Sequence, residues 1–481
     1  MTKNTLTSQT DQSPQRYKHR LGSGSIGLPG VLMQSVAQIS PTLGIFYTIA
    51  FTTGQAGMTA PLTYLLAFAV CLTLAVPIGG LARHLPSAGG FYTYVSQALG
   101  PRTGFLVGWL YGVAVALVPA ALAAFTGAVL HDELLAEYGF GLPWWVYAAV
   151  ILALCFTVAF RGIVISARFM IVMGLFEIAV GLGLAVTGVF DPGPGGVTAA
   201  GFNPANIPSS SGFFLAVVLS IFAFTGFESA ATIGEESRDP HRIIPRSIVG
   251  SVAAIGVFYV FTAWGLQIGW GVSALDEMAT SPAAPAFVLA ERLWHGGWIL
   301  VLIALVNSGI AVCIACTTSA TRTLYGMSRT GALPPALGVV HPRHRTPHVA
   351  VTAQTLGAAL VLVAFGASFG PYNLFYLFGV AGTFVYVIIF TLTNLAAWRF
   401  FRTRRPEEFS WSSHVAFPIV STVALAVIAY KSLIPLPAWP VRLGPLITIG
   451  YVVSGAILLA VSLRPGRRAW MARAGELPDV A

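Results

Sequence analysis

The sequence predicts an all-α protein that crosses a membrane about twelve times. Hydrophobic residues make up 56% of the chain and charged residues only 9%, whereas a soluble domain carries roughly a quarter charged residues. The mean hydropathy is +0.77. At about 20 apolar residues per span, the 481 residues of the chain leave room for roughly a dozen spanning helices. A soluble protein is therefore excluded.

Long apolar runs mark the predicted spans in order along the chain. They lie at 31–52, 60–82, 104–130, 143–160, 169–190, 212–234, 248–270, 298–325, 349–365, 374–398, 415–434 and 443–463. Runs of this length and composition are typical of helices that cross the hydrocarbon layer. We therefore expect one transmembrane domain at 28–463, between polar tails at 1–27 and 464–481.

The basic residues predict which way the helices run. Lys and Arg accumulate in the short loops on the cytoplasmic side of a membrane. With the N-terminus inside, only Arg292, Lys431 and Arg442 of the 26 basic residues fall outside. We expect both termini in the cytoplasm and a multi-pass protein of the cytoplasmic (inner) membrane. The net charge of +9 then reflects the basic cytoplasmic loops of a protein surrounded by membrane lipid. It does not indicate a nucleic-acid partner.

The cysteines show no pattern of a metal or redox site. Cys71, Cys155, Cys313 and Cys316 all fall in apolar runs. The last two have Cys-x-x-Cys spacing, but no His or further Cys accompanies them. The sequence also lacks the Gly-x-x-x-x-Gly-Lys-[Ser/Thr] phosphate-binding motif. We therefore expect no cofactor, no metal and no ATP-driven mechanism.

Two predicted spans are interrupted near their centres. In the first, Pro41 removes a helix hydrogen bond and Gly44 loosens the turn beyond it. In the sixth, Thr225 and Gly226 are followed two residues later by the carboxylate of Glu228. The sequence predicts that both helices are broken at mid-membrane. The alternative is an ordinary proline kink with an unrelated glycine.

The two breaks also predict an internal repeat. They lie five spans apart, and an odd offset reverses the orientation of a helix in the membrane. We expect inverted repeats at about 28–190 and 212–401, with two extra helices at about 414–463. Equivalent breaks in such repeats meet near the midplane, where they form a binding site.

Several motifs carry a resemblance to a known family. The segments GFES at 226–229, EESRDP at 235–240 and IPR at 244–246 resemble the sixth-helix signature of the amino acid-polyamine-organocation (APC) superfamily of permeases. PSAGGFYTY at 86–94 and SRTGALP at 328–334 reinforce it. The resemblance implies the five-plus-five inverted-repeat fold of a bacterial leucine transporter plus two C-terminal helices. It also implies secondary active transport.

Unpaired backbone groups at the two breaks suit a zwitterion. A carboxylate fits the N–H groups at a half-helix N-terminus near Thr42 to Gly44, and an ammonium fits the carbonyls of 222–225. Side chains of other spans complete the walls, although Tyr111, Phe224 and Asn307 also fit a simple packing role. The candidate substrate-binding residues are Ser40, Thr42, Leu43, Gly44, Tyr111, Phe222, Ala223, Phe224, Thr225, Gly226 and Asn307.

Only two acidic residues lie deep in predicted spans, and a carboxylate there is costly enough to indicate a function. Glu228 belongs to the family motif, and we interpret it as a protonatable group or as a fixed acceptor that braces the broken helix. The resemblance places Glu177 where exchangers of the superfamily often have lysine and where the leucine transporter binds sodium. It either holds a proton or cation together with Thr317 and Thr318 or is a neutral structural group.

These observations predict a permease of amino acids or related small amines. We expect proton-coupled symport by alternating access, with the proton as coupling ion and a small molecule as substrate. The alternatives of the same fold are an exchanger or a uniporter. An intramembrane enzyme or sensor is a more remote alternative, and we expect no enzymatic activity.

Overall fold

The structure is a computed structural model that describes residues 21–281, 283–434, 438–464 and 468–477. Within these residues the chain is helical, and the only β-type pairing is an isolated bridge between Ile26 and Ser237. The prediction of an all-α fold is confirmed. Most of the predicted tail at 1–27 and part of the tail at 464–481 lie outside the described residues.

The long helices follow the order that the sequence predicts. The first half contains α1 (Leu28–Ile39), α2 (Pro41–Ala56), α3 (Ala60–His84), α4 (Phe91–Leu99), α5 (Pro101–Tyr138), α6 (Trp144–Arg161) and α7 (Ile163–Phe190). The second half contains α8 (Ser210–Phe222), the 3₁₀ segment η4 (Phe227–Glu236), α9 (Pro240–Trp270), α10 (Leu275–Thr280), α11 (Pro285–Trp294), α12 (Trp298–Arg329), α13 (His348–Phe369) and α14 (Pro371–Arg404).

The C-terminal part adds α15 (Phe417–Lys431), which follows a π-helical turn at Ser412–Ala416, then α16 (Gly444–Ser462) and α17 (Trp470–Arg473). Short 3₁₀ turns lie in the connections, at Gly57–Thr59, Ala200–Phe202, Pro204–Asn206, His295–Gly297, Pro335–Gly338, Pro406–Glu408 and Val441–Leu443.

The helices account for the predicted number of spans. Eleven helical stretches among the described residues are long and apolar enough to cross a membrane. The first of them, Leu28–His84, has 57 residues and would be about 85 Å long as a single helix. It divides into α1 with α2 as one broken span and α3 as another, so the eleven stretches supply twelve spans.

Some helices differ from the apolar runs that predict them. α5 continues to Tyr138 and α9 begins at Pro240, because polar turns extend a helix beyond the hydrocarbon layer. The short helices α4, α10, α11 and α17 have no counterpart among the predicted spans. Segments too short to cross a membrane leave no long apolar run in the sequence.

Helices at matching places in the two halves pack against corresponding helices of the other half. α3 packs on α9, and α5 packs on α12. α7 lies against α9 and α12, while its counterpart α14 lies against α3 and α5. An inverted repeat produces this pattern, and the repeat boundaries themselves stay a prediction.

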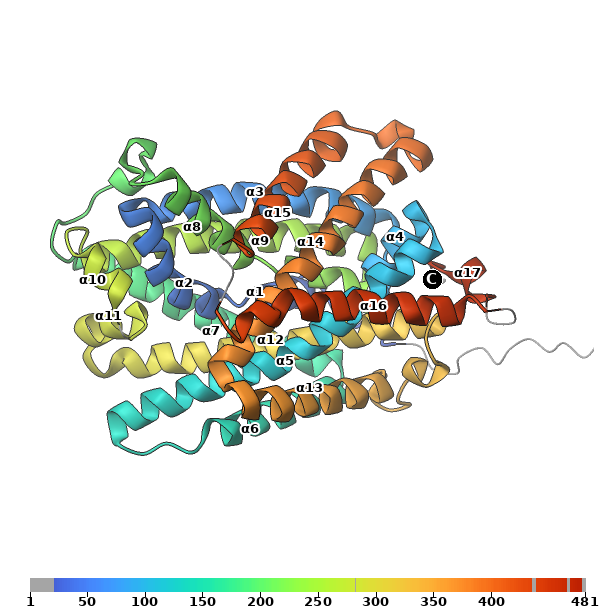
Figure 1. The fold of residues 1–481 in the computed structure, drawn as a ribbon, viewed down its shortest axis with the longest axis horizontal. Coiled ribbons are helices and arrows are strands. Elements are labelled where there is room, and N and C mark those ends of the chain that lie inside the picture. Colours follow the sequence, from blue (N-terminus) through green and yellow to red (C-terminus); the bar gives the residue numbers. More distant parts are fainter. Residues whose placement is uncertain (1–20, 282, 435–437, 465–467, 478–481) are drawn as a thin grey trace, which may run out of the picture.

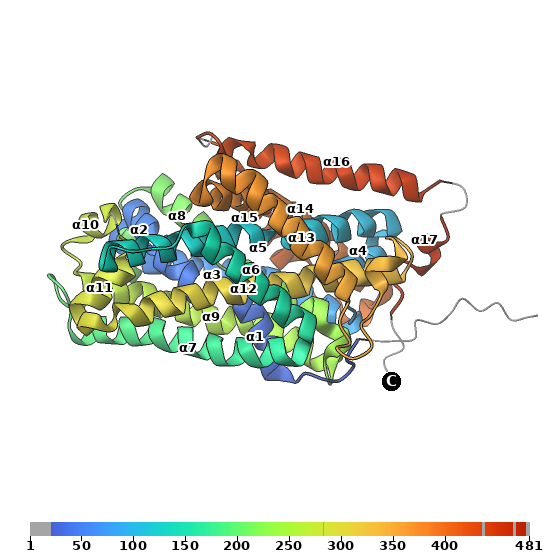
Figure 2. The same ribbon diagram turned by 90° about the horizontal axis from the view of Figure 1, so that it is seen from below.

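The broken helices lie inside the bundle, and the C-terminal helices lie outside it. Figure 1 shows the long helices α5, α7, α9 and α12 running along the long axis, with α1 and α8 among them. In Figure 2, α16 lies along the outer edge of the bundle. Leu446 and Ile457 of α16 are about three-fifths exposed, as expected for a helix that faces lipid.

Candidate functional site

The first predicted break lies between α1 and α2. α1 ends at Ile39, Ser40 takes a left-handed conformation with φ of 65°, and α2 begins at Pro41. Proline suits the first position of a helix because its ring fixes φ and the N–H it lacks has no helical partner there. The Oγ of Ser40 lies 2.7 Å from the Oγ of Ser308 on α12, which holds the break against that helix.

The second predicted break lies between α8 and η4. α8 ends at Phe222, and Gly226 has φ of 118° and ψ of −16° before η4 starts at Phe227. A side chain is rarely tolerated at such a φ, which explains the glycine. The turn is closed locally, since the Thr225 hydroxyl donates to the carbonyl of Phe222 at 2.8 Å.

The two breaks touch each other directly. A Cβ at Gly226 would lie 2.5 Å from the carbonyl carbon of Gln38 and 2.8 Å from the nitrogen of Ile39. Gly226 therefore allows the backbone of the second break to pack against the end of α1. The expectation that the breaks meet is confirmed by this contact.

Tyr259 of α9 connects both breaks, and it was not among the predicted site residues. Its hydroxyl donates to the carbonyl of Ala223 at 3.0 Å. The same hydroxyl occupies the space that a Cβ at position 44 would need. Gly44 is therefore needed for the approach of Tyr259, in addition to any role in loosening the helix.

Glu228 is fully buried beside the second break. Its Oε2 accepts a hydrogen bond from the N–H of Gly226 at 2.9 Å, and its Oε1 lies 3.5 Å from the amide nitrogen of Gln38. Gln38 in turn accepts from the hydroxyl of Ser319 on α12 at 2.9 Å. The carboxylate thus belongs to a polar network that joins both broken helices to α12.

Further hydrogen bonds hold α1 to η4. The Ser35 hydroxyl donates to the carbonyl of Phe227 at 2.6 Å and accepts from the N–H of Ala230 at 3.2 Å. The Ser229 hydroxyl donates to the carbonyl of Gln34 at 3.1 Å. These bonds satisfy backbone groups that the breaks and the 3₁₀ geometry leave without helical partners.

Glu177 of α7 is fully buried beside the first break. Its Oε2 accepts a hydrogen bond from the Thr42 hydroxyl at 3.0 Å and lies 3.5 Å from the Thr42 backbone nitrogen. Its Oε1 has no hydrogen-bond partner among the described residues. Each break therefore has its own buried carboxylate.

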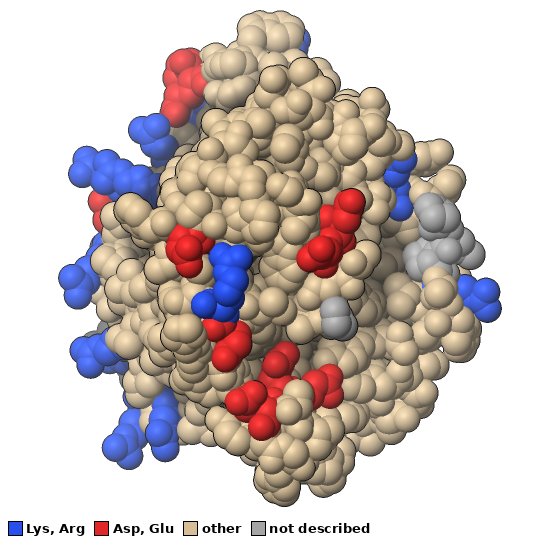
Figure 3. Space-filling view, turned by 90° about the vertical axis from the view of Figure 1, so that its left-hand side faces the viewer, with Lys and Arg blue, Asp and Glu red and all other residues tan. Residues whose placement is uncertain are grey.

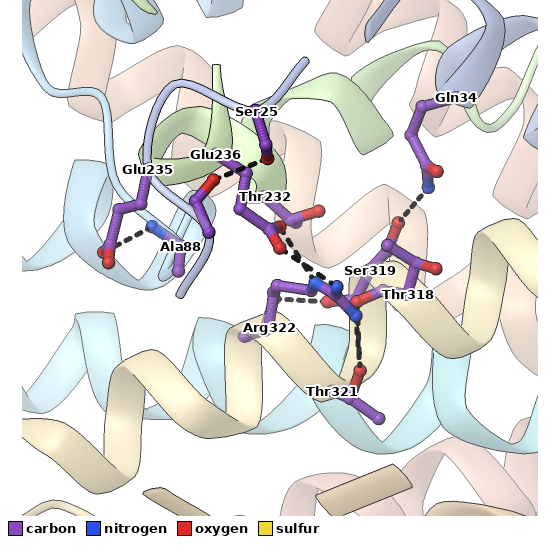
Figure 4. A network of polar contacts seen from close by, with 12 residues as sticks. Ser25, Gln34, Ala88, Thr232, Glu235, Glu236, Thr318, Ser319, Thr321 and Arg322 are labelled. Carbon is purple, nitrogen blue, oxygen red and sulfur yellow. Dashed lines mark hydrogen bonds and ion pairs between the residues drawn. The ribbon is translucent and has the colours of Figure 1, made fainter. Parts of the chain in front are cut away.

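The structure does not bring Thr317 and Thr318 to Glu177. The Thr42 hydroxyl that bonds Glu177 also contacts the carbonyl of Ala304 on α12. Thr317 lies thirteen residues further along that helix, about 20 Å away. Thr318 adjoins Ser319 (Figure 4), which bonds Gln38 and Gln34, so both threonines lie on the side of Glu228.

The remaining predicted contact residues point in different directions. Phe224 packs between Phe68 and Tyr259, with ring centroids 6.5 Å and 5.1 Å away. The Asn307 amide donates to the carbonyl of Met173 on α7 at 3.1 Å. Tyr111 is buried, and its hydroxyl has no partner among the described residues. Of these three, Tyr111 through its hydroxyl and Asn307 through its Oδ1 each have a buried polar atom without a partner among the described residues.

A small cavity adjoins the second break. It lies beside Thr225 and Phe227 and has a volume of about 20 Å³, which is room for about one water molecule. It is lined by residues of α3, α8, α14 and α15, including Tyr386. This cavity by itself is too small for an organic substrate.

Two ion pairs close the end of the bundle where η4 finishes. Arg322 of α12 donates through Nε and Nη2 to the two oxygens of Glu236 at 3.1 and 3.2 Å, and both side chains are 1% exposed. Arg329 bonds Glu235 at 2.6 Å, and Glu235 also accepts from the N–H of Ala88 at 2.9 Å. Figure 4 shows how Arg322 reaches from α12 toward η4.

The opposite end is acidic. Figure 3 looks onto this end and shows acidic side chains spread over it. It carries the ends of α5 and α11 and a hollow of about 580 Å³. The hollow is lined by Glu133, Ala136, Glu137, Phe287, Val288, Glu291, Arg292 and Trp298.

Sequence reasoning missed the residues that connect the breaks to other helices. Gln34 and Gln38 carried a usable signal, because two amides four residues apart share one face of a helix in an otherwise apolar run. Tyr259 and Ser308 carried none, since a tyrosine or serine within an apolar helix looks the same whether it packs or connects two elements.

Comparisons with known proteins agree with this architecture. A family model described as amino acid permease matches residues 30–436. The low-affinity putrescine importer of Escherichia coli (strain K12) is 28% identical over 410 residues, covering 82% of this chain and 84% of the relative.

Two further relatives are named as permeases of amino acids. The branched-chain amino acid permease of Bacillus subtilis (strain 168) is 28% identical, covering 64% of this chain and 68% of the relative. The gamma-aminobutyric acid permease of Escherichia coli (strain K12) is 26% identical, covering 72% and 74%. Since the family model spans most of the sequence, the chain belongs to the amino acid permease family of membrane transporters and is not an enzyme.

Proposed function

We propose that the chain is a proton-coupled secondary transporter of amino acids or related small amines that works by alternating access. The observation that carries this proposal is the contact between two mid-membrane helix breaks, each with a buried carboxylate. Broken helices that meet at the midplane are the usual substrate and ion sites of transporters built from repeats. The named substrates of the three relatives all contain an amino group.

The two carboxylates support proton coupling. Glu177 and Glu228 are fully buried, and their hydrogen-bond partners are hydroxyl, amide and backbone N–H groups. A bare charge in such a place is costly, which suits each group to carry a proton. Glu228 adjoins the contact between the breaks, so we assign the coupling proton to Glu228 first.

The distribution of charge supports an orientation. Positive residues accumulate on the cytoplasmic side of membrane proteins, and the end of the bundle with Glu133, Glu137 and Glu291 is acidic. The proposal therefore places the acidic end outside, and both termini and the Glu236–Arg322 pair on the cytoplasmic side of the inner membrane.

Uptake into liposomes tests the coupling. Purified protein is expected to concentrate a radiolabelled substrate when an inward proton gradient is imposed. Glu228→Gln keeps the shape of the side chain but cannot carry the proton, so accumulation should be lost while exchange between loaded compartments survives. Glu407→Gln is the matched control, because Glu407 is 60% exposed at a surface turn. If Glu228→Gln, Glu177→Gln and the double variant all still concentrate substrate, carboxylate coupling is wrong.

A further inference from the structure

The first turn of α2 already contains a carboxylate, which the protein itself supplies. The N-terminus of a helix attracts anions because its N–H groups lack helical partners. The Thr42 hydroxyl donates to Glu177 at 3.0 Å and the Thr42 N–H lies 3.5 Å from the same oxygen. The N–H of Gly44 donates to the carbonyl of Ser40 at 2.8 Å. The place expected for a substrate carboxylate is therefore filled by Glu177.

Glu177 is built into the protein at this position. The residue is 0% exposed, and its Thr42 partner is bonded in turn to the carbonyl of Ala304 on α12 at 3.2 Å. The second oxygen, Oε1, has no partner among the described residues. A buried carboxylate oxygen without a partner is costly, so it favours a proton or a cationic donor.

The second break is also occupied by a carboxylate. Glu228 caps the N–H of Gly226 at 2.9 Å, and its Oε1 has only a long contact of 3.5 Å with Gln38. The buried cation Arg322 is bound at short distance by both oxygens of Glu236. Each break therefore offers a carboxyl group, which suits a substrate ammonium, whereas the carboxylate of a zwitterion also needs a positive partner.

The acidic end of the molecule points to the same class of ligand. Its hollow of about 580 Å³ is lined by Glu133, Glu137 and Glu291, against the single cation Arg292. Acidic walls raise the local concentration of cations and lower that of anions. An amine with a net positive charge is enriched there more strongly than a zwitterion.

We propose that the substrate of this chain is an amine without a carboxylate, whose ammonium group is held by Glu177. This inference rests on the proposed function and specifies its substrate class. At about 6 Å and an effective dielectric constant of about 20, repulsion from one ionised carboxylate lowers the affinity for a substrate carboxylate by roughly a hundredfold. If Glu177 is protonated, this repulsion is absent, but Glu177 still occupies the hydroxyl and N–H of Thr42, which a substrate carboxylate would need.

Matched pairs of compounds that differ by one carboxylate test the substrate class. Binding and liposome uptake are measured for putrescine against ornithine and for 3-methylbutylamine against leucine. We expect the amine of at least one pair to bind more than tenfold more tightly than its amino acid. Equal or tighter binding of the amino acids overturns the inference and leaves the transport proposal standing. If no compound of either pair is bound or transported, both proposals fail.

Glu177→Gln tests the residue that is assigned this discrimination. The variant should bind the amine at least tenfold more weakly and should reduce the preference for amine over amino acid. Glu407→Gln is the control with unchanged affinity, and melting temperature reports whether both variants are folded. An unchanged preference in folded Glu177→Gln overturns the assignment, and the wild-type pairs decide the substrate class even if the variant does not fold.

Discussion

Replacement of Gly226 by alanine should be one of the most damaging single changes in the chain. The residue has φ of 118°, and holding a residue with a side chain in such a region costs about 1–3 kcal/mol. The new Cβ would lie 2.5 Å from the carbonyl carbon of Gln38, so the breaks must separate. Separation weakens the three hydrogen bonds of Ser35 and Ser229 between α1 and η4, at about 0.5–1.5 kcal/mol each.

The expected loss of stability is therefore about 2.5–7.5 kcal/mol, accompanied by weaker substrate binding. The assay is thermal unfolding of the detergent-purified variant with a substrate titration. Gly379→Ala in α14 is the matched control, because a Cβ there meets no atom within 4 Å and alanine favours a helix by up to about 1 kcal/mol over glycine. If Gly226→Ala has the same melting temperature as Gly379→Ala and binds substrate normally, the contact between the breaks does not stabilise the protein or its binding site.

Three further changes test the connections of the site. Glu236→Gln leaves the buried Arg322 unpaired and should destabilise the protein by about 3–5 kcal/mol; the double variant with Arg322→Gln should melt at a higher temperature than Glu236→Gln, and a lower one would show that the pair is not coupled. Tyr259→Phe loses the bond to Ala223 and should lower the unfolding free energy by about 1 kcal/mol, which a denaturation series measures; an unchanged value would contradict the geometry. Thr42→Val removes the donor to Glu177 and should slow uptake, whereas Thr42→Ser should keep it; equal rates would exclude a role for the hydroxyl.

The breaks were predictable because their chemistry is local. Pro41 cannot donate a helix hydrogen bond, and Gly226 signals a conformation that other residues avoid, so both positions stand out in an apolar run. The partners of the breaks were not predictable. Ser308 and Tyr259 meet the breaks from α12 and α9, and nothing in their own neighbourhoods distinguishes them from packing residues.

The role of Thr42 shows where sequence reasoning fails for a physical reason. The half-helix N-terminus was correctly located, since α2 begins at Pro41, and a carboxyl group of the protein, that of Glu177, lies beside Thr42 there. Which anion arrives depends on how α7 is rotated against α2, and rotation depends on packing between helices that are far apart in the sequence. The predicted contact between Glu177 and Thr317 failed for the same reason. How far α12 is shifted along its axis relative to α7 is set by packing alone.

The ends of η4 indicate which contacts can change during transport. Near Gly226, η4 is bonded to α1 through Ser35 and Ser229. At its other end, the backbone of Ile26 bonds the carbonyl of Glu236 and the N–H of Arg238 at 3.1 and 3.0 Å. Because it is tied at both ends, η4 should move together with α1 as one body.

The contacts of that body with α12 combine hydrogen bonds, between Ser40 and Ser308 and between Gln38 and Ser319, with ion pairs. They include the Glu236–Arg322 and Glu235–Arg329 pairs, whose ions recover their hydration once water enters. An exposed ion pair is worth at most about 1 kcal/mol, so separation into water removes little net stability, whereas separation in a dry interior is costly. We therefore expect entry of water at this end to lower the cost of separating α1 and η4 from α12.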